Sequence, residues 1–495
     1  MPPPVAAEQS AVPLCVDLDG TLIYTDLVWE SLVRLLRHNP LYGFVVPFWL
    51  MAGRARLKEE IAKRVDVDPA ALPYNEALLE YLRSERSAGR QIILATASDS
   101  RLARRVADHL GLFNETLASD GQTNLRGKNK GSRLVEKFGS KAFDYAGNSS
   151  VDLPVWEQSR MAIVVNGARG LETKAGKCTD VSRVFPSSHS LLGSLLQAIR
   201  PHQWVKNLII FVPLVTAHKL QEMTLCLQAA VAFVAFNLGA SGVYVMNDLV
   251  DLEADRHHPG KKQRPFASGA LPISVGFIVI PILLCAAAVL AFMLNPGFAA
   301  VIGIYFLLTT SYSWRLKQVS LLDVFCLAAL YTIRLVAGHE ATGVRYSFWL
   351  LLFSMFIFLS LALVKRFQEL SAARQQTRVD IKGRGYAASD LELVATLGAS
   401  SGYLAVLVMA LYVNSEDVLR LYRTPILLLL ICPLLLFWIS RVWLIAHRGQ
   451  MHEDPIVFAL KDRASYVIGF LALVVLWMAT LDWHGAVLST PALPR

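Results

Sequence analysis

The chain has 495 residues, of which 54% are hydrophobic and 18% charged, and its formal net charge is +9. That length suffices for two or three domains, and the apolar content is uneven: residues before about 190 look soluble, whereas those after about 205 form long apolar runs. Basic loops of a membrane protein account for the net charge, so the charge does not indicate a nucleic-acid partner.

The N-terminal region shows no targeting segment. It lacks a basic stretch followed by an apolar one, so we expect no cleavable signal, a short leader at residues 1–10 and a first domain in the cytoplasm. The six cysteines are scattered without metal-ligand spacing, which predicts neither a disulfide framework nor a zinc site.

A buried strand is predicted at residues 13–16, and the sequence DLDGT follows it at residues 17–21. Two carboxylates just past a strand end, Asp17 and Asp19, can face one site, and the Gly-Thr turn lets the backbone close around a phosphate. A second buried strand is predicted at residues 92–96.

These segments resemble the motifs of the haloacid dehalogenase (HAD) superfamily of phosphoryl-transfer enzymes. The resemblance also rests on Lys130 ahead of a helix and on DYAGNSSVD at residues 144–152, and it covers roughly residues 12–170. It implies an α/β domain with a parallel sheet, in which Asp17 is the nucleophile and Asp19 the general acid/base. It further implies phosphate binding by Thr96 and Lys130, and Mg²⁺ binding by Asp17, Asn148 and Asp152.

One position departs from the HAD pattern. The chain has Asn148 where the family usually has Asp, so the metal site loses one negative charge. Two readings stay open: an active phosphatase, and a degenerate domain with a regulatory or scaffolding role.

A helical cap is predicted at residues 25–88. Within it, the apolar run Leu41–Met51 is too short to span a bilayer, and basic residues follow it. It is either a buried cap helix or a segment on the membrane surface. We place the HAD-like domain at residues 11–185, a linker at 186–196, and a membrane domain at 197–485.

Nine apolar segments follow, each a candidate transmembrane helix of an all-α domain. If the N-terminus is cytoplasmic, the loops after the second, fourth, sixth and eighth segments are cytoplasmic too. Those loops contain most of the Lys and Arg residues, in agreement with the positive-inside pattern. The approximate spans are 206–218, 224–247, 273–294, 297–314, 320–337, 345–364, 395–413, 424–444 and 464–481.

The second segment runs into an acidic stretch. At about 100° per residue, Asp248, Asp251 and Asp255 share one helix face, Asn247 borders it and Glu253 points away. Three unpaired acids would repel one another, and a divalent cation such as Mg²⁺ removes that repulsion. A solvated helix end is the plainer reading.

The surrounding motifs resemble the UbiA superfamily of intramembrane transferases. They are QWVKN at residues 203–207, NDLVDLEADRHHP at 247–259 and KKQRP at 261–265. The resemblance covers about residues 197–485 and implies nine transmembrane helices around a cavity. It also implies a Mg²⁺–diphosphate site at Asn247, Asp248, Asp251 and Asp255.

A second acidic motif of that superfamily, DxxxD, is replaced by KRFQEL at residues 365–370, and the next acids are Asp380 and Asp390. Cations there suit a pair of substrates that carries further phosphates besides one diphosphate. This variant resembles the polyprenyl-phosphate phosphoribosyltransferase branch. Candidate phosphate contacts are Lys206, Arg256, Lys261, Arg264, Lys365 and Arg366. The intramembrane residues Asp323 and Arg334 form an ion pair or face a polar cavity.

The resemblances imply transfer of 5-phosphoribose from phosphoribosyl diphosphate to a polyprenyl phosphate, with Mg²⁺ as cofactor. The HAD-like domain would hydrolyse a phosphoester such as the product 5-phosphate. The alternative is a prenyltransferase that acts on an aromatic or quinone-precursor acceptor, with a non-catalytic HAD-like module. We expect an integral, multi-pass protein of the cytoplasmic membrane, and a homo-oligomer is left open.

Overall fold

The structure is a computed structural model that describes residues 12–120, 122–187, 190–375, 385–451, 455–459 and 461–481. The chain divides into two compact units. The first comprises Met1–Arg200 and Tyr244–Pro281, and the second comprises Pro201–Val243 and Ile282–Arg495. Each unit is described by itself.

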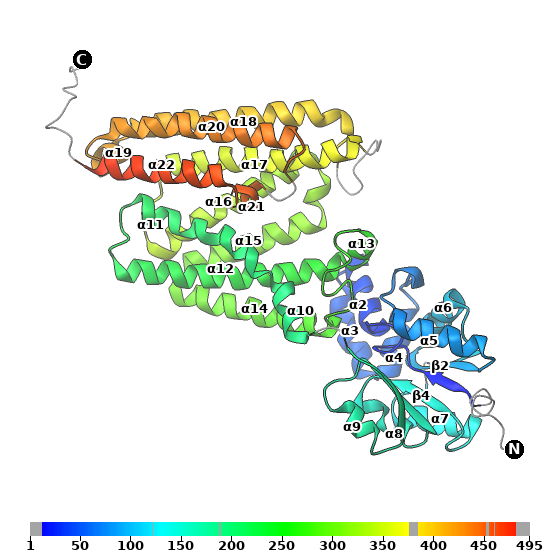
Figure 1. Ribbon diagram of the computed structural model, residues 1–495. Coiled ribbons are helices and arrows are strands. Elements are labelled where there is room, and N and C mark those ends of the chain that lie inside the picture. Colours follow the sequence, from blue (N-terminus) through cyan, green and yellow to red (C-terminus); the bar gives the residue numbers. More distant parts are fainter. Residues whose placement is uncertain are drawn as a thin grey trace, which may run out of the picture. The chain divides into compact units, whose positions relative to one another are not determined.

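The first unit is built on a six-stranded parallel sheet with the order β3-β2-β1-β4-β5-β6 (Figure 1). All three residues of β1 are buried and pair with β2 on one side and β4 on the other. Because the strand order reverses at β1, its carboxyl end lies at a switch point, where α/β proteins bind ligands. The strands are β1 (Leu14–Val16), β2 (Ile92–Asp99), β3 (Glu115–Ser119), β4 (Asp144–Gly147), β5 (Met161–Val165) and β6 (Asp180–Phe185).

Helices join these strands, as the sequence predicts for a doubly wound sheet. Those between β1 and β2 form the predicted cap; α2 begins there because Asp26 accepts hydrogen bonds from the backbone N–H groups of Val28 and Trp29. The cap helices are α2 (Leu27–His38), α3 (Tyr42–Met51), α4 (Arg54–Ala62), η1 (Pro69–Ala71) and α5 (Glu76–Ser87). The others are α6 (Ser100–Leu110), α7 (Lys128–Phe138), η2 (Ser150–Asp152), α8 (Leu153–Trp156) and α9 (Leu171–Ala175).

The segment after the sheet contains a helix within the predicted linker. Helix α10 (Leu191–Ile199) begins where Ser190 accepts a hydrogen bond from the backbone N–H of Gly193. Ser188 and His189, two further linker residues, lie outside the described residues. The second stretch of the first unit, Tyr244–Pro281, contains three helical segments. They are the end of α12 (Met223–Val250), α13 (Leu252–His257) and the start of α14 (Ile273–Leu294).

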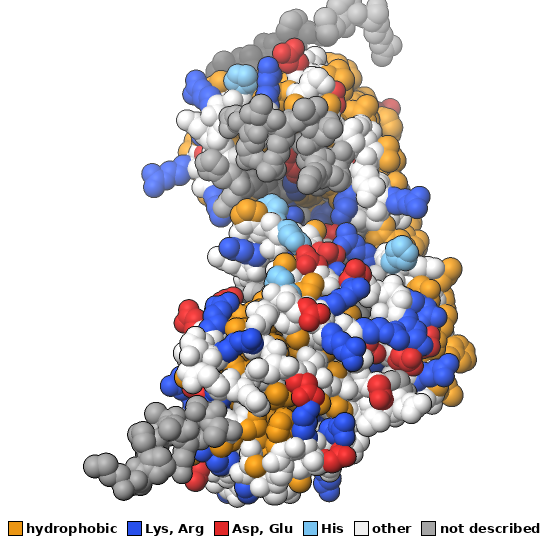
Figure 2. Space-filling view, turned by 90° about the vertical axis from the view of Figure 1, so that its right-hand side faces the viewer, with side chains coloured by type: hydrophobic (Ala, Val, Ile, Leu, Met, Phe, Trp, Pro, Cys, Tyr) orange, Lys and Arg blue, Asp and Glu red, His pale blue; other side chains and the backbone are white. Residues whose placement is uncertain are grey.

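Eight helices of the described residues are long and apolar enough to cross a membrane, which confirms the predicted all-α membrane domain. Besides α12 and α14 they are α15 (Pro296–Trp314), α16 (Leu322–Thr342), α17 (Phe348–Gln375), α18 (Leu391–Val413), α20 (Ile431–His447) and α22 (Arg463–Thr480). Large apolar side chains on them are exposed, for example Phe292 at 69% and Phe470 at 66%. Figure 2 shows apolar side chains at the molecular surface beside interspersed charged ones. The exposed apolar side chains of these helices require lipid, not water, around them.

The first predicted span differs from the other eight. Residues 206–218 belong to a 3₁₀ helix, η3 (Pro201–Phe211), and the short helix α11 (Val212–Thr216). Pro213 stands at the start of α11, where its missing N–H breaks no helical hydrogen bond. This segment was already the shortest of the nine predicted spans, and it forms two short helices in place of one span.

Close helix packing in the second unit depends on small residues. On α18, Gly398 and Gly402 face α20: a Cβ on Gly398 would lie 2.1 Å from Trp443, and one on Gly402 would lie 2.6 Å from Ile439. Glycines four residues apart allow two membrane helices to approach closely. The remaining short elements are η4 (Leu316–Gln318), η5 (Ala388–Asp390), α19 (Glu416–Leu421), η6 (Pro425–Leu430) and α21 (Pro455–Ala459).

Candidate functional site

Two acidic sites emerge in the first unit, and the one at the end of β1 centres on Asp17. Its carboxylate Oδ1 lies 2.8 Å from the Lys130 ammonium on α7 and accepts a hydrogen bond from the backbone N–H of Leu18. Burial raises the pKa of Asp17 to about 7, while Lys130 acts in the opposite direction. The structure thus brings together the predicted nucleophile and the predicted phosphate-binding lysine, which are 113 residues apart (130 − 17).

Asp19 is held by three donors. Its Oδ1 accepts from the backbone N–H of Leu27 at 2.9 Å, and its Oδ2 accepts from the hydroxyls of Ser98 at 2.6 Å and Thr96 at 3.3 Å. Burial raises the pKa of Asp19 to about 6, so a proton can be held on this carboxyl close to neutral pH. Thr96, predicted to bind phosphate, contacts Asp19 itself. Ser98 is a partner that the sequence analysis missed.

Asp152 uses both oxygens within the protein. Oδ1 accepts from the Tyr145 hydroxyl, and Oδ2 accepts from the backbone N–H groups of Asn148 and Ser149 and from the Ser149 hydroxyl. Lys130 in turn donates to the Tyr145 hydroxyl at 2.7 Å. These four hydrogen bonds hold Asp152 in the loop after β4, with three donors on Oδ2 and one on Oδ1. Its role as a Mg²⁺ ligand stays a prediction.

Asn148 lies over the loop that follows β1. Gly20, with a φ of +75°, has no room for a side chain, because a Cβ would meet the Asn148 amide nitrogen at 2.1 Å. The carboxylate of Asp17 and the amide oxygen of Asn148 are hard ligands of the kind that Mg²⁺ prefers. Within the described part of the chain, however, no group of three or more His, Cys, Asp or Glu is arranged to hold a metal.

Lys58 of the cap is a further cation at this site. From α4 its ammonium donates to the backbone carbonyl of Ala97 at 2.6 Å and to Asn124 at 3.2 Å. Burial lowers the pKa of Lys58, and the negative charges of Asp19 and Asp26 oppose that shift. The sequence analysis placed this lysine only among the basic residues after the apolar run, because nothing local indicates which sheet edge a cap residue reaches.

The second acidic site lies where α12 ends. The helix stops at Val250, Asp251 interrupts it, and α13 continues at Leu252, so the acids do not share one continuous helix. Even so, Asp248 and Asp255 approach the same group: Arg264 Nη1 lies 3.0 Å from Asp248 Oδ1 and 2.6 Å from Asp255 Oδ2.

Two further cations approach these carboxylates. Arg200 Nη2 lies 2.5 Å from Asp248 Oδ1, and Lys261 Nζ lies 4.0 Å from Asp255 Oδ1. Both aspartates are 2% exposed, and burial raises the pKa of Asp255 against the opposing effect of Arg264. Arg200 is a contact that the sequence pattern did not predict.

Two side-chain oxygens at this site are free to accept a cation. Asn247 Oδ1 and Asp248 Oδ2 are buried and have no hydrogen-bond partner among the residues that the structure describes. Buried polar atoms without a partner are rare because desolvation is costly. Asn247 and Asp248, with Asp251 and Asp255 close in the chain, are the residues that would hold Mg²⁺, which when bound would offset the charge of a diphosphate.

Arg256 does not fit the predicted role of a phosphate contact. Its guanidinium pairs with both carboxylate oxygens of Glu30 on α2, and its Nε donates to the carbonyl of Ala267 at 3.0 Å. The side chains of Arg256 and Glu30 are 5% and 1% exposed. A guanidinium that forms an ion pair with a buried carboxylate stabilises the fold and is not available to a ligand.

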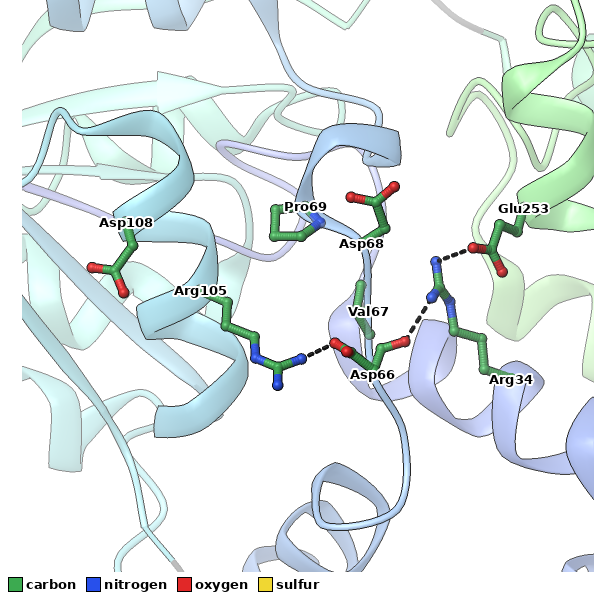
Figure 3. A pocket seen from close by; sticks show the side chains of 8 residues that line it. All are labelled: Arg34, Asp66, Val67, Asp68, Pro69, Arg105, Asp108 and Glu253. Carbon is green, nitrogen blue, oxygen red and sulfur yellow. Dashed lines mark hydrogen bonds and ion pairs between the residues drawn. The ribbon is translucent and has the colours of Figure 1, made fainter.

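A polar cavity of about 610 Å³ lies in the same unit (Figure 3). Both of its arginines have partners. Arg34 Nη2 lies 3.6 Å from Glu253 Oε1, and Arg34 Nη1 donates to the backbone carbonyl of Asp66. The side-chain carboxylate of Asp66 pairs with Arg105. None of the predicted site residues lines it. The lining residues are Arg34, Asp66, Val67, Asp68, Pro69, Arg105, Asp108 and Glu253.

The remaining predicted phosphate contacts belong to the second unit. Lys206 lies in η3, and Lys365 and Arg366 lie in α17. Arg366 is fully buried and pairs with Asp323 at 2.5 Å and with Glu369, so its predicted role as a phosphate contact is not supported. Asp380, one of the two acids that follow this segment in the sequence, lies outside the described residues.

The two intramembrane charges of α16 have separate partners. Asp323 pairs with Arg366 and accepts a hydrogen bond from the Tyr386 hydroxyl at 2.7 Å. Arg334 instead donates to Asn207 at 2.6 Å and lies against three aromatic rings. Asp323 is thus in an ion pair, although not with Arg334.

Comparison with known proteins agrees with both resemblances. The UbiA prenyltransferase family matches residues 208–461, and the haloacid dehalogenase-like hydrolases match residues 14–157. Protein y4nM of Sinorhizobium fredii, described as uncharacterized, is 39% identical over 93% of this chain and 89% of its own length. It is therefore similar along both domains.

Two other relatives each match little more than half of this chain. Nodulation protein NoeC of Azorhizobium caulinodans is 37% identical over 55% of this chain and 88% of its own length. Decaprenyl-phosphate phosphoribosyltransferase of Mycobacterium tuberculosis is 31% identical over 59% of this chain and 94% of its own length.

Proposed function

We propose that this chain, which belongs to the UbiA prenyltransferase family, transfers 5-phosphoribose from phosphoribosyl diphosphate to a polyprenyl phosphate. The coarser description is established by the family match and the membrane helices: an integral membrane transferase of the UbiA type that carries a HAD-like domain. The lipid acceptor, the phosphoribosyl donor and Mg²⁺ are the proposal.

The observation that carries the proposal is similarity over 94% of the length of a decaprenyl-phosphate phosphoribosyltransferase. The site chemistry supports it. The first acidic motif is kept, with unsatisfied oxygens on Asn247 and Asp248, whereas the second is replaced by a segment that contains Lys365. We keep Lys206, Lys261, Arg264 and Lys365 as proposed phosphate contacts.

The chemistry requires little acid–base assistance. The phosphate oxygen of the lipid forms a bond to the anomeric carbon of ribose, and the bond from that carbon to the diphosphate breaks. The acceptor is already anionic, so no strong general base is needed. Orientation of the two substrates and stabilisation of the leaving charge would supply most of the rate enhancement.

The decisive experiment supplies membranes that contain the chain with radiolabelled phosphoribosyl diphosphate and a polyprenyl phosphate. We expect label in the lipid phase that disappears with EDTA and returns with Mg²⁺. The matched arm supplies a prenyl diphosphate and an aromatic acid. Product in that arm alone would favour the alternative prenyltransferase and overturn the proposal.

For the HAD-like domain we propose hydrolysis of the 5-phosphate of the lipid product. A carboxylate oxygen of Asp17 forms a bond to phosphorus, the bond from phosphorus to the ribose oxygen breaks, and Asp19 gives its proton to that oxygen. Water then forms a bond to phosphorus and gives a proton back to Asp19, and the bond between phosphorus and Asp17 breaks to release phosphate. The contact of Asp17 with Lys130 and the three donors on Asp19 support this assignment.

The proposal places both sites on the cytoplasmic side, where attachment in one chain raises the effective concentration of the lipid product at the phosphatase. Mass spectrometry of the lipid product from the wild-type and Asp17→Asn proteins tests it. We expect the 5-phosphorylated lipid to accumulate only with Asp17→Asn. Equal accumulation with both would leave the domain as a docking module, for which Asn148 is the supporting feature.

A further inference from the structure

Helix α3 of the cap is apolar along its whole length, and none of its residues is buried. Its sequence, YGFVVPFWLM, has no charged residue. Phe44, Phe48 and Met51 are 75%, 70% and 84% exposed. A helix that is apolar on all sides normally lies inside a protein or in lipid. The sequence analysis left both a buried cap helix and a membrane-surface segment open, and the structure excludes burial within the described chain.

The residues of α3 that do pack are close to a membrane helix. Tyr42, Val46 and Trp49 join a cluster that includes α2 residues and Phe277. Phe277 is the fifth residue of α14, one of the candidate membrane spans, and its ring lies 5.1 Å from that of Trp29 on α2. Phe277, little more than one turn into that helix, therefore belongs to the cluster that supports α3.

The flanks of α3 carry exposed positive charge. Arg37 precedes the helix, and Arg54 and Arg56 follow it. Trp49 packs under the guanidinium of Arg64 at 4.8 Å. Apolar residues bordered by arginines are typical of segments that insert between lipid headgroups, where phosphates meet the cations. At 10 residues, about 15 Å long, α3 is too short to cross the bilayer.

We propose that α3 lies in the boundary between headgroups and acyl chains of the bilayer that this chain spans, with Phe44, Phe48 and Met51 in contact with lipid. The HAD-like domain is then attached to the membrane surface through its cap as well as through the chain. If the HAD-like domain hydrolyses the lipid product as proposed above, this arrangement holds its site at the surface where that product is formed.

Photo-crosslinking of the full-length protein tests the proposal. The photoreactive residue p-benzoylphenylalanine replaces Phe48 or Met51, and the protein is reconstituted in vesicles of phosphatidylethanolamine and phosphatidylglycerol. Both side chains are exposed, so neither substitution removes internal packing, and the second position guards against a failure of the first. Phe292, exposed on α14, is the positive control, and Glu136, exposed on α7, is the negative control.

We expect phospholipid adducts at positions 48 and 51, as at position 292, and none at position 136. Absence of lipid adducts at both α3 positions, with adducts at position 292, would overturn the proposal. So would crosslinks from both α3 positions to a second copy of the chain in place of lipid.

Discussion

The carboxylates at the end of β1 and those around the end of α12 are both largely buried, yet their hydrogen-bond and ion-pair partners differ. Asp17 and Asp19 receive one ammonium, two hydroxyls and backbone N–H groups. Asp248 and Asp255 share Arg264, and Asp248 also pairs with Arg200. Arginine stays charged under all ordinary conditions, whereas hydroxyls and amides supply no net charge.

This difference separates two kinds of chemistry. Burial raises the pKa of Asp17 to about 7 and that of Asp19 to about 6, so both carboxyls can exchange a proton near neutral pH. Burial raises the pKa of Asp255 as well, but the fixed charge of Arg264 opposes that shift, which suits binding of a metal and of anionic groups. Four substitutions test the contacts on which this contrast depends, and one of them also tests whether the two sites act independently.

The largest effect is expected from Asp248→Ala. It removes a buried carboxylate that contacts two arginines, so transfer should fall by about 1,000-fold, the range for loss of an electrostatic stabiliser. Activity is measured as radiolabel entering lipid. Glu253→Ala is the matched control, because Glu253 contacts Arg34 instead, and it should stay near wild type. Equal losses in both variants would contradict the assignment of the site.

Glu30→Ala comes next and concerns stability. It leaves the Arg256 guanidinium buried without its carboxylate partner, which should reduce the free energy of unfolding by about 3 kcal/mol. Chemical denaturation of the detergent-solubilised chain measures the change. The control, Arg34→Ala, removes a more exposed pair and should cost about 0–1 kcal/mol. If the Glu30 variant is as stable as wild type, Arg256 has another partner, and the conclusion that its ion pair with Glu30 stabilises the fold is wrong.

Lys130→Met addresses the β1 site alone. Loss of the ammonium beside Asp17 should reduce phosphoester hydrolysis by about 100-fold, because the transferred phosphoryl charge loses its stabilising cation. Release of phosphate from a generic aryl phosphate ester measures this activity. Transfer of phosphoribose by the same preparation should be unchanged. A parallel decrease in transfer would show that the two sites depend on each other.

The smallest effect is expected from Tyr145→Phe. The hydroxyl receives a hydrogen bond from Lys130 and donates one to Asp152, while Lys130 keeps its contact with Asp17. Hydrolysis should fall by about fivefold, equivalent to about 1 kcal/mol for a lost hydrogen bond. A loss as large as that of Lys130→Met would mean that Tyr145 itself contacts the substrate.

The sequence alone determined the features that depend on local pattern. Buried strands ending at Asp17 and Thr96 predicted the parallel sheet, and apolar runs predicted eight of the helices that the structure contains. The resemblance to the HAD superfamily, which rests on motif spacing, also predicted that Asp17 and Lys130 lie in one site. These predictions succeeded because periodicity and residues at strand ends follow from backbone geometry, whatever the rest of the chain does.

Only the tertiary structure decided which charges are available to a ligand. Arg256 and Arg366 stand in basic stretches that suggest phosphate binding, yet each pairs with a buried acid, Glu30 and Asp323, and Glu30 lies 226 residues from its partner. The exposure of α3 was likewise undecided by its composition, because an apolar run fits a protein core and a lipid surface equally well. A buried guanidinium requires an acceptor, and the identity of that acceptor depends on which distant segments the fold brings together.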